Sequence, residues 1–376
     1  MNPIYFDNAA TTPLHPEVVE AMLPVMQTTF GNPSSTHALG RIARTEIEKA
    51  RRSIAKLLNC TPAELFFTSG GTEADNMAIR CSVHDLGVKH IISTKIEHHA
   101  VTHTLDELEK DGLARISYVK LLPNGHIDLH ELESLLQYEG PTLVTLMHGN
   151  NEIGNMIDLQ EVGSLCRKYN AYFHSDTVQT MGYFAMDLQN TPVDFVNGAG
   201  HKFNGPKGIG FIYIRAGVGI KPLIHGGAQE RNMRGGTENI YGIVGLAKAL
   251  EIAYRELEVK EKHIRDIKAY FIAQLRKEIP GVAFNGDAEG RSLYTVLNVS
   301  FPPTDKAEML LFNLDIAGIC ASGGSACSSG SNVGSHVLTG IGSNPDRPAV
   351  RFSFGKQNTK AEIDFTISKL KEILGC

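Results

Sequence analysis

Short apolar runs alternate with amphipathic stretches through the first two thirds of the chain. The runs have the length of strands and lie near residues 65–68, 90–93, 116–119, 143–147, 172–174, 195–196 and 209–214. Helical patterns separate most of the earlier runs, at residues 72–86, 99–111, 128–138 and 158–170. This alternation predicts an α/β fold of parallel strands joined by crossover helices, with ligands bound beyond the carboxyl ends of the strands.

The last third of the chain has a different pattern. A long amphipathic stretch runs from about residue 237 to about 278, and Pro280-Gly281 ends it. Beyond it the pattern predicts a smaller α+β unit, with strands near residues 294–300, 317–320 and 349–354 and helices near 305–314 and 359–374. We therefore expect a large domain at residues 16–250 and a small domain at 251–376 that also includes the N-terminal segment 1–15.

Composition and charge exclude several classes of protein. Of the 376 residues, 42% are hydrophobic and 20% charged, which is typical of a globular chain. The net charge of -5 gives no electrostatic reason to expect nucleic acid or an anionic membrane as a partner. No apolar run approaches the roughly 18 residues of a spanning helix, and the first residues lack the pattern of a signal peptide. The six cysteines are too scattered for a disulfide framework, which indicates a reducing cytoplasm.

A lysine and an acid follow two of the predicted strands. Lys202 stands in a Gly-rich turn after the run at 195–196, and Asp176 follows the run at 172–174. Alone, Lys202 would be interpreted as a solvated surface residue. Together, the two residues are typical of a pyridoxal phosphate (PLP) enzyme, in which the lysine forms a Schiff base and the acid pairs with the pyridinium nitrogen.

The turn at Gly70-Gly71 predicts an anion site. It joins the strand at 65–68 to the helix that follows, so backbone N–H groups and the helix dipole would face a phosphate. Thr72 can cap this helix or contact the phosphate. The Gly-rich stretch at residues 205–210 indicates a tight turn into a strand instead.

The sequence leaves His98 two roles: a structural residue, or a ring stacked on a cofactor and available for proton transfer. His99 and His103 have the i, i+4 spacing of metal ligands on a helix, but no carboxylate or cysteine nearby in the sequence completes a set. We therefore predict no metal site.

Among the cysteines, Cys327 has a distinct setting. It lies in a stretch at residues 321–331 that is almost all Gly and Ser, which predicts a mobile loop. Cys166 and Cys320 lie in apolar patterns, Cys60 and Cys81 lie at or near helix ends, and Cys376 is terminal. Cys327 is thus the candidate reactive thiol, provided that a local base or cation helps it ionise.

These motifs, in this order and spacing, resemble the NifS/IscS group of cysteine desulfurases, within the class V aminotransferase-like PLP enzymes. The resemblance runs nearly from end to end and is carried by residues 5–13, 31–35, 68–76, 97–98, 150–154, 176–179, 200–203, 233–237, 325–327 and 351–355. It implies the aspartate aminotransferase-like fold of PLP-dependent transferases, with a mostly parallel central sheet and a smaller C-terminal α+β domain.

The resemblance also implies a role for each candidate residue. Lys202 would bind PLP and move the proton of substrate Cα, Asp176 would pair with the pyridinium nitrogen, and His98 would stack on the ring. Arg351 would hold the substrate carboxylate, Asn151 would also contact the substrate, and Cys327 would take the sulfur as a persulfide while alanine is released. The remaining cofactor contacts would come from Gly71, Thr72, Asn151, Gln179, His201 and, from the other subunit of a homodimer, Thr237.

The implied partners are L-cysteine and a sulfur-acceptor protein such as an Fe–S scaffold. One departure from the family pattern is Ala199, where relatives often carry a serine that helps to bind the phosphate. A selenocysteine lyase, another PLP aminotransferase or lyase, and a non-enzymatic sulfur-transfer scaffold remain as alternatives. A selenocysteine lyase would share nearly all of these residues. Another PLP aminotransferase or lyase would not need Cys327, and a scaffold would not need both Lys202 and Cys327.

Overall fold

The computed structural model describes residues 3–304, 307–323 and 334–375. In this part of the chain, seven strands form a central sheet in the order β2-β8-β7-β6-β5-β3-β4. The strands are β2 (Leu65–Thr68), β3 (His90–Ser93), β4 (Arg115–Tyr118), β5 (Thr142–Thr145), β6 (Tyr172–Ser175), β7 (Phe195–Ala199) and β8 (Gly210–Ile214). All are parallel to their neighbours except β8, which runs antiparallel to both β2 and β7.

At the antiparallel strand β8, the regular alternation of parallel strands and crossover helices is interrupted. β7 and β8 are joined by a short turn over residues 200–209, with no crossover helix, so β8 must return in the opposite direction. The prediction of a mostly parallel sheet is confirmed, and the turn predicted at residues 205–210 does lead into a strand.

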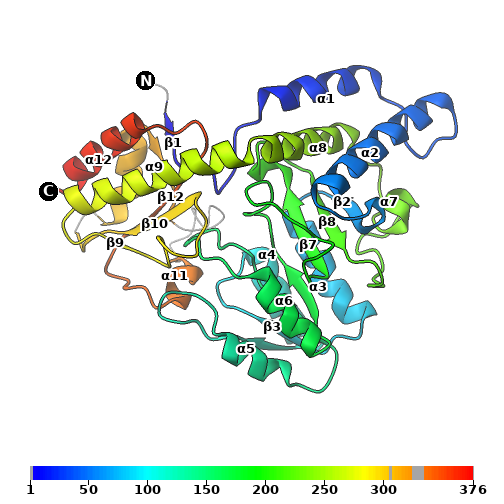
Figure 1. Cartoon of the computed structure of the whole chain (residues 1–376), viewed down its shortest axis with the longest axis horizontal. Helices are drawn as coiled ribbons and strands as arrows, with labels where there is room; N and C mark the ends of the chain where they lie inside the picture. Colours follow the sequence, from blue (N-terminus) through cyan, green and yellow to red (C-terminus); the bar gives the residue numbers. More distant parts are fainter. Residues whose placement is uncertain (1–2, 305–306, 324–333, 376) are drawn as a thin grey trace.

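Helices cover both faces of the central sheet (Figure 1). Alternate strand residues point to opposite faces, so Phe66 packs with α3 while its neighbour Phe67 belongs to the core on the other side. One face carries α3 (Gly71–Asp85) and α4 (His99–Lys110). The other carries α2 (Ala38–Leu57), α5 (Leu129–Leu136), α6 (Leu159–Lys168) and α8 (Ile240–Arg255).

The amphipathic stretch predicted at 237–278 is two helices. α8 ends at Arg255, Glu256 has non-helical backbone angles, and α9 (Leu257–Glu278) begins after it. α8 packs on α2 and on α1 (Pro16–Thr28), whereas α9 packs on α12 (Lys360–Leu374). Because of this break, the apolar face of α8 packs in one lobe and that of α9 packs in the other. Figure 1 shows the two lobes.

A three-stranded antiparallel sheet, β12-β10-β9, forms the core of the lobe beside α9 and α12. Its strands are β9 (Ala283–Phe284), β10 (Val296–Ser300) and β12 (Ala349–Ser353). The N-terminal strand β1 (Ile4–Tyr5) pairs here with β11 (Ile319–Cys320), far from it in sequence. The remaining elements are α7 (Gln229–Asn232), α10 (Leu310–Ile316), α11 (His336–Gly340) and the 3-10 turns η1 (Pro62–Glu64), η2 (Gly200–Lys202) and η3 (Ala307–Met309).

The predicted domain limits stay a prediction; the structure shows only that β1 of the N-terminal segment pairs with β11. None of the helices in the described ranges has the length and apolar character needed to cross a membrane.

Candidate active site

Lys202 and Asp176 lie at the same edge of the central sheet. Asp176 directly follows β6, and Lys202 ends the 3-10 turn η2 after the neighbouring parallel strand β7. Lys202 Nζ donates to the carbonyl oxygens of Ala9 at 2.6 Å and Ala10 at 2.9 Å. Asp176 is 7% exposed, and its Oδ1 accepts the Val178 N–H at 2.9 Å.

A cavity of about 230 Å³ lies above these two residues, between the sheet edge and the smaller lobe. Among the predicted site residues that the structure describes, all but Thr237 line it. Its lining consists of Ala9, Ala10, Gly71, Thr72, Asp75, His98, Met147, Gly149, Asn151, Asp176, Val178, Gln179, Ala199, His201, Lys202 and Arg351.

The amino end of α3 is open toward the cavity. Gly70 is its N-cap, and no side chain accepts a hydrogen bond from the first turn at this cap. Thr72 lies inside that turn, so the alternative that Thr72 caps the helix is wrong. A Cβ at Gly71 would come within 2.6 Å of Val178 Cγ2, so a larger residue would push on the segment after Asp176. The uncapped amides and the helix dipole suit a phosphate.

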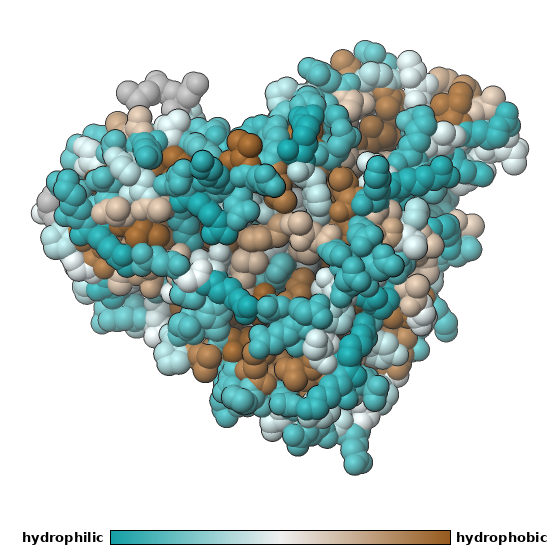
Figure 2. All heavy atoms as spheres, in the orientation of Figure 1, coloured by the Kyte–Doolittle hydropathy of each residue, from teal (hydrophilic) through white to brown (hydrophobic). Residues whose placement is uncertain are grey.

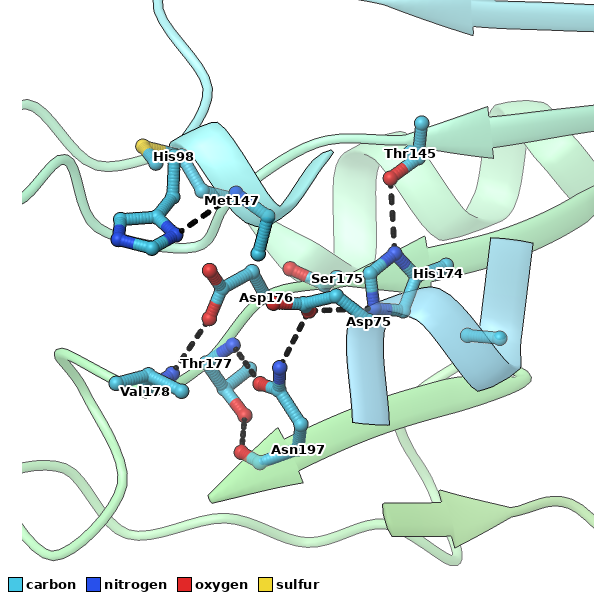
Figure 3. A network of polar contacts seen from close by, with 12 residues as sticks. Asp75, His98, Thr145, Met147, His174, Ser175, Asp176, Thr177, Val178 and Asn197 are labelled. Atoms are coloured by element: carbon cyan, nitrogen blue, oxygen red, sulfur yellow. Dashed lines mark hydrogen bonds and ion pairs between the residues drawn. The ribbon is translucent and has the colours of Figure 1, made fainter. Parts of the chain in front are cut away.

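His98 is the N-cap of α4. Its Nδ1 accepts the Ala100 N–H at 3.1 Å, which leaves Nε2 to carry the proton of the neutral ring. Burial lowers the pKa of His98; Asp176 opposes this shift, and the charge of Lys202 adds to it. A neutral ring therefore stands beside Asp176 at the cavity wall (Figure 3).

His201 and Gln179 line the cavity together with Lys202. His201 Nδ1 is 3.2 Å from Thr11 Oγ1, and burial together with the charges of Lys202 and Lys207 lowers its pKa to about 4. Gln179 Nε2 donates to the Ala9 carbonyl at 3.0 Å, the same oxygen that Lys202 contacts. The N-terminal segment thus holds both side chains.

Arg351 reaches the cavity from β12 of the smaller lobe and is 1% exposed. Its Nη1 donates to the Asn151 carbonyl at 2.9 Å, and its Nη2 donates to Asp7 Oδ1 at 2.9 Å. Its Nε is buried and has no hydrogen-bond partner among the residues that the structure describes. A buried guanidinium N–H without an acceptor is a donor that an anionic ligand can satisfy.

Thr237 does not line this cavity. It is exposed, three residues before α8, beside a separate hollow that Arg234 and Glu230 also line. Its predicted contact with the other subunit of a dimer stays a prediction, as does the role of Cys327, which lies outside the described residues.

The other described cysteines lie in settings that disfavour a thiolate. Burial raises the pKa of Cys60 and of Cys81 to about 12, and it also raises the pKa of Cys166 and of Cys320. Because the thiolate is the reactive form, these four are poor nucleophiles.

His99 and His103 face one another with ring centroids 4.7 Å apart. In the described ranges neither histidine belongs to a group of three side chains that could bind a metal ion. Because the structure contains no metal ion, the prediction of no metal site stays a prediction.

The sequence did not predict the polar network beneath the cavity (Figure 3). Asp75, one turn into α3, is 1% exposed and accepts a hydrogen bond from Asn197 Nδ2. It also lies close to His174 of β6. The only signal in the sequence was Asp75 itself, an acid on the helix after the Gly70-Gly71 turn. The helical pattern places it on the face that packs against the sheet. The Ala9 and Ala10 carbonyls gave no sequence signal at all.

Comparisons with known proteins agree with this geometry. The aminotransferase class-V family matches residues 4–365. The putative cysteine desulfurase IscS 1 of Bacillus subtilis (strain 168) is 44% identical, over 100% of this chain and 99% of that protein.

Solved structures give the same result. That of a NifS-like protein covers 99% of both chains at 37% identity, with a TM-score of 0.91. That of SspA in complex with cysteine covers 95% of this chain and 100% of SspA at 31% identity, with a TM-score of 0.83. A match of this length, around a cavity that joins Lys202 to Asp176, shows that the chain belongs to the aminotransferase class-V family.

Proposed function

We propose that this protein is a PLP-dependent cysteine desulfurase that converts L-cysteine to L-alanine and passes the sulfur to Cys327 as a persulfide. The observation that carries the proposal is the joining of Lys202, Asp176 and Arg351 around one cavity. The full-length similarity to proteins named cysteine desulfurase supports it.

The cavity residues fit PLP. The amides at the start of α3, with Thr72 and His201 beside them, would hold the phosphate. Asp176 would pair with the ring nitrogen, His98 would stack on the ring, and Asn151 and Gln179 would contact its substituents. When bound, PLP supplies an electron sink for negative charge at substrate Cα. Ala199 offers no hydroxyl, so one phosphate hydrogen bond that relatives make would be absent.

The substrate carboxylate would be bound by Arg351. Its two Nη groups already have acceptors, while the buried Nε lacks one among the described residues. A carboxylate oxygen at Nε would satisfy this donor, and Asn151 stands beside it. Such binding would place Cα near Lys202, which would move the proton at that carbon.

The sulfur would be taken by Cys327. The four described cysteines are disfavoured as thiolates by burial, and Cys376 is terminal. A Gly/Ser-rich setting gives Cys327 the reach to accept sulfur and to present it to a second protein, such as an Fe–S scaffold. The scattered cysteines support a reducing, cytoplasmic location.

A homodimer is part of this proposal. Large apolar side chains are exposed on and beside α1 and α2, with Phe30 at 72% exposure. Figure 2 shows hydrophobic atoms at the upper right, over these helices. We call this the α1–α2 patch; it consists of Leu14, Val19, Leu23, Met26, Phe30, Leu39 and Ile42.

Both α1 and α2 pack on α8, and Thr237 lies just before α8, so a second copy seated on the patch would have Thr237 nearby. An isologous contact would then give two equivalent sites.

The decisive experiment assays alanine and sulfide release from L-cysteine by the PLP-loaded protein, with L-selenocysteine in parallel and with a dithiol present to reduce the persulfide and free its sulfur as sulfide. Stoichiometric alanine and sulfide from L-cysteine supports the proposal. Activity with L-selenocysteine alone would favour the selenocysteine lyase, and amino-group transfer to an oxo acid would favour an aminotransferase. No turnover of any of these substrates would favour the scaffold.

A further inference from the structure

Two buried carboxylates, Asp75 and Asp176, lie together at the floor of the cavity. They are 1% and 7% exposed, and polar atoms of the two and of His98 all lie within 4.8 Å of one another. Two negative charges this close and this poorly hydrated repel strongly, so one of the two groups is expected to keep a proton.

The surroundings of the two acids differ. Asp176 Oδ1 accepts a backbone N–H from Val178, a bond that favours the charged form. Asp75 Oδ1 accepts from the neutral side-chain amide of Asn197 and lies 3.4 Å from His174 Nε2. The geometry therefore gives Asp75, and not Asp176, a neighbour that could accept a proton in a hydrogen bond.

His174 needs such a donor. Its Nδ1 is 2.8 Å from Thr145 Oγ1, while its Nε2 is buried and has no hydrogen-bond partner in the described part of the chain. Burial lowers the pKa of His174 to about 3, so the ring is neutral. If Nδ1 carries the ring proton and donates to Thr145, Nε2 is an acceptor facing Asp75 (Figure 3).

We propose that Asp75 is a positioning residue that keeps a proton at neutral pH and donates a hydrogen bond to His174. Asp176 is then the carboxylate that faces the cofactor ring. This role deepens the proposed function and rests on it. Burial, and next the charge of Asp176, raise the pKa of Asp75 well above its ordinary value. The titratable groups that face it are thus Asp176, Glu97, His98 and His174.

The neutral acid also orients Asp176 through Asn197. Asn197 donates to Asp75, its Oδ1 accepts the Thr177 N–H at 2.8 Å, and its carbonyl accepts from Thr177 Oγ1. Thr177 directly follows Asp176. Asp75 therefore fixes the backbone that aims the Asp176 carboxylate, without touching the cofactor itself.

The protonation state can be read in the wild-type protein by infrared spectroscopy. PLP-loaded protein labelled with carbon-13 aspartate should show the C=O stretch of a buried carboxylic acid, moved by the label and by heavy water. Glu97 is not labelled and cannot contribute. This band should vanish in Asp75→Asn and persist in Asp85→Asn, a control at the far end of α3. Absence of the band, or an imidazolium signal from His174 in nitrogen NMR, would overturn the proposal.

A pH titration of the bound cofactor's visible absorbance tests the positioning role. Asp75→Asn keeps a donor for His174 and an acceptor for Asn197, and it removes no charge if Asp75 is protonated. The midpoint of the cofactor's titration in this variant should therefore match that of the wild type. Asp176→Asn removes a charge and should move the midpoint by about 1 pH unit or more. Asp75→Ala, which leaves His174 and Asn197 unpaired, should weaken cofactor binding at least about tenfold, with rescue in Asp75→Asn.

A shift in Asp75→Asn as large as that in Asp176→Asn would mean that Asp75 is an anion. The infrared result does not depend on turnover. If the band is present but the protein does not act on L-cysteine, the proposed function fails while the protonation of Asp75 stands.

Discussion

Arg351 Nη2 donates to Asp7 Oδ1 at 2.9 Å and so ties β12 of the smaller lobe to the segment that follows β1. The bond fixes one end of an almost fully buried guanidinium at the wall of the cavity. The side chain that we propose to bind the substrate carboxylate therefore also joins the two lobes.

Replacing Arg351 by lysine should weaken binding of L-cysteine. Lysine keeps the charge but loses the planar donor set, so we expect KM to rise about 10- to 100-fold with a smaller change in kcat. Steady-state kinetics and a PLP titration check this, and PLP affinity should stay near that of the wild type. An unchanged KM would show that another group binds the carboxylate.

Lys202→Ala should abolish the cofactor's covalent attachment. Borohydride reduction followed by peptide mass spectrometry should find PLP on Lys202 in the wild type and on no lysine in the variant. Lys207→Ala is the matched control, because Lys207 is exposed in the same turn, and it should label normally. A reduced adduct on Lys207 in the wild type would disprove the assignment.

Cys327→Ser should still bind PLP and L-cysteine but release no alanine above background. After brief exposure to L-cysteine, mass spectrometry should find an added sulfur on Cys327 in the wild type. Cys320→Ser is the control: burial raises the pKa of the Cys320 thiol, so its removal should leave the persulfide in place. Sulfur mapped to Cys320, with Cys327→Ser still active, would reverse the roles.

Glu97 should make the wild type lose stability as pH rises. Burial, reinforced by the charge of Asp176, raises the pKa of Glu97 from 4.5 to about 8, so the folded state binds a proton that the unfolded state has released. This contribution is fully present below 4.5 and is lost as pH rises toward about 8, at up to about 1.4 kcal/mol per pH unit.

Glu97→Gln removes that titration. Denaturant unfolding between about pH 5 and pH 8 should therefore show that the free energy of unfolding of the variant increases relative to that of the wild type as pH rises. A difference in unfolding free energy that stays constant with pH would mean that Glu97 is charged in the folded protein.

Charges placed in the α1–α2 patch should dissociate the proposed dimer. Met26→Glu combined with Phe30→Glu is expected to give monomers in analytical ultracentrifugation and weaker PLP binding, because Thr237 no longer reaches the partner's phosphate. Val259→Glu is the control, since Val259 is 77% exposed on α9, outside the patch. A monomeric double variant with full PLP affinity would contradict the shared site.

Local patterns in the sequence determined much of this protein. The alternation of apolar runs and helical patterns gives the order of strands and helices, because a period of two or of 3.6 residues is a property of neighbouring positions. Lys202 and Asp176 are recognised in the same way: each stands within a few residues of the end of a strand, and parallel strands bring their carboxyl ends to one edge. The Gly70-Gly71 turn before α3 is a signal of the same kind.

Only the tertiary structure decided the rest, because it depends on contacts between distant segments. The break at Glu256, the bond from Lys202 to Ala9 and that from Arg351 to Asp7 have no local signature. Asp75 and His174 become a pair only when α3 packs on the face of the sheet where β6 presents its histidine. Their protonation follows from burial and from neighbouring charges, which no spacing of residues along the chain records.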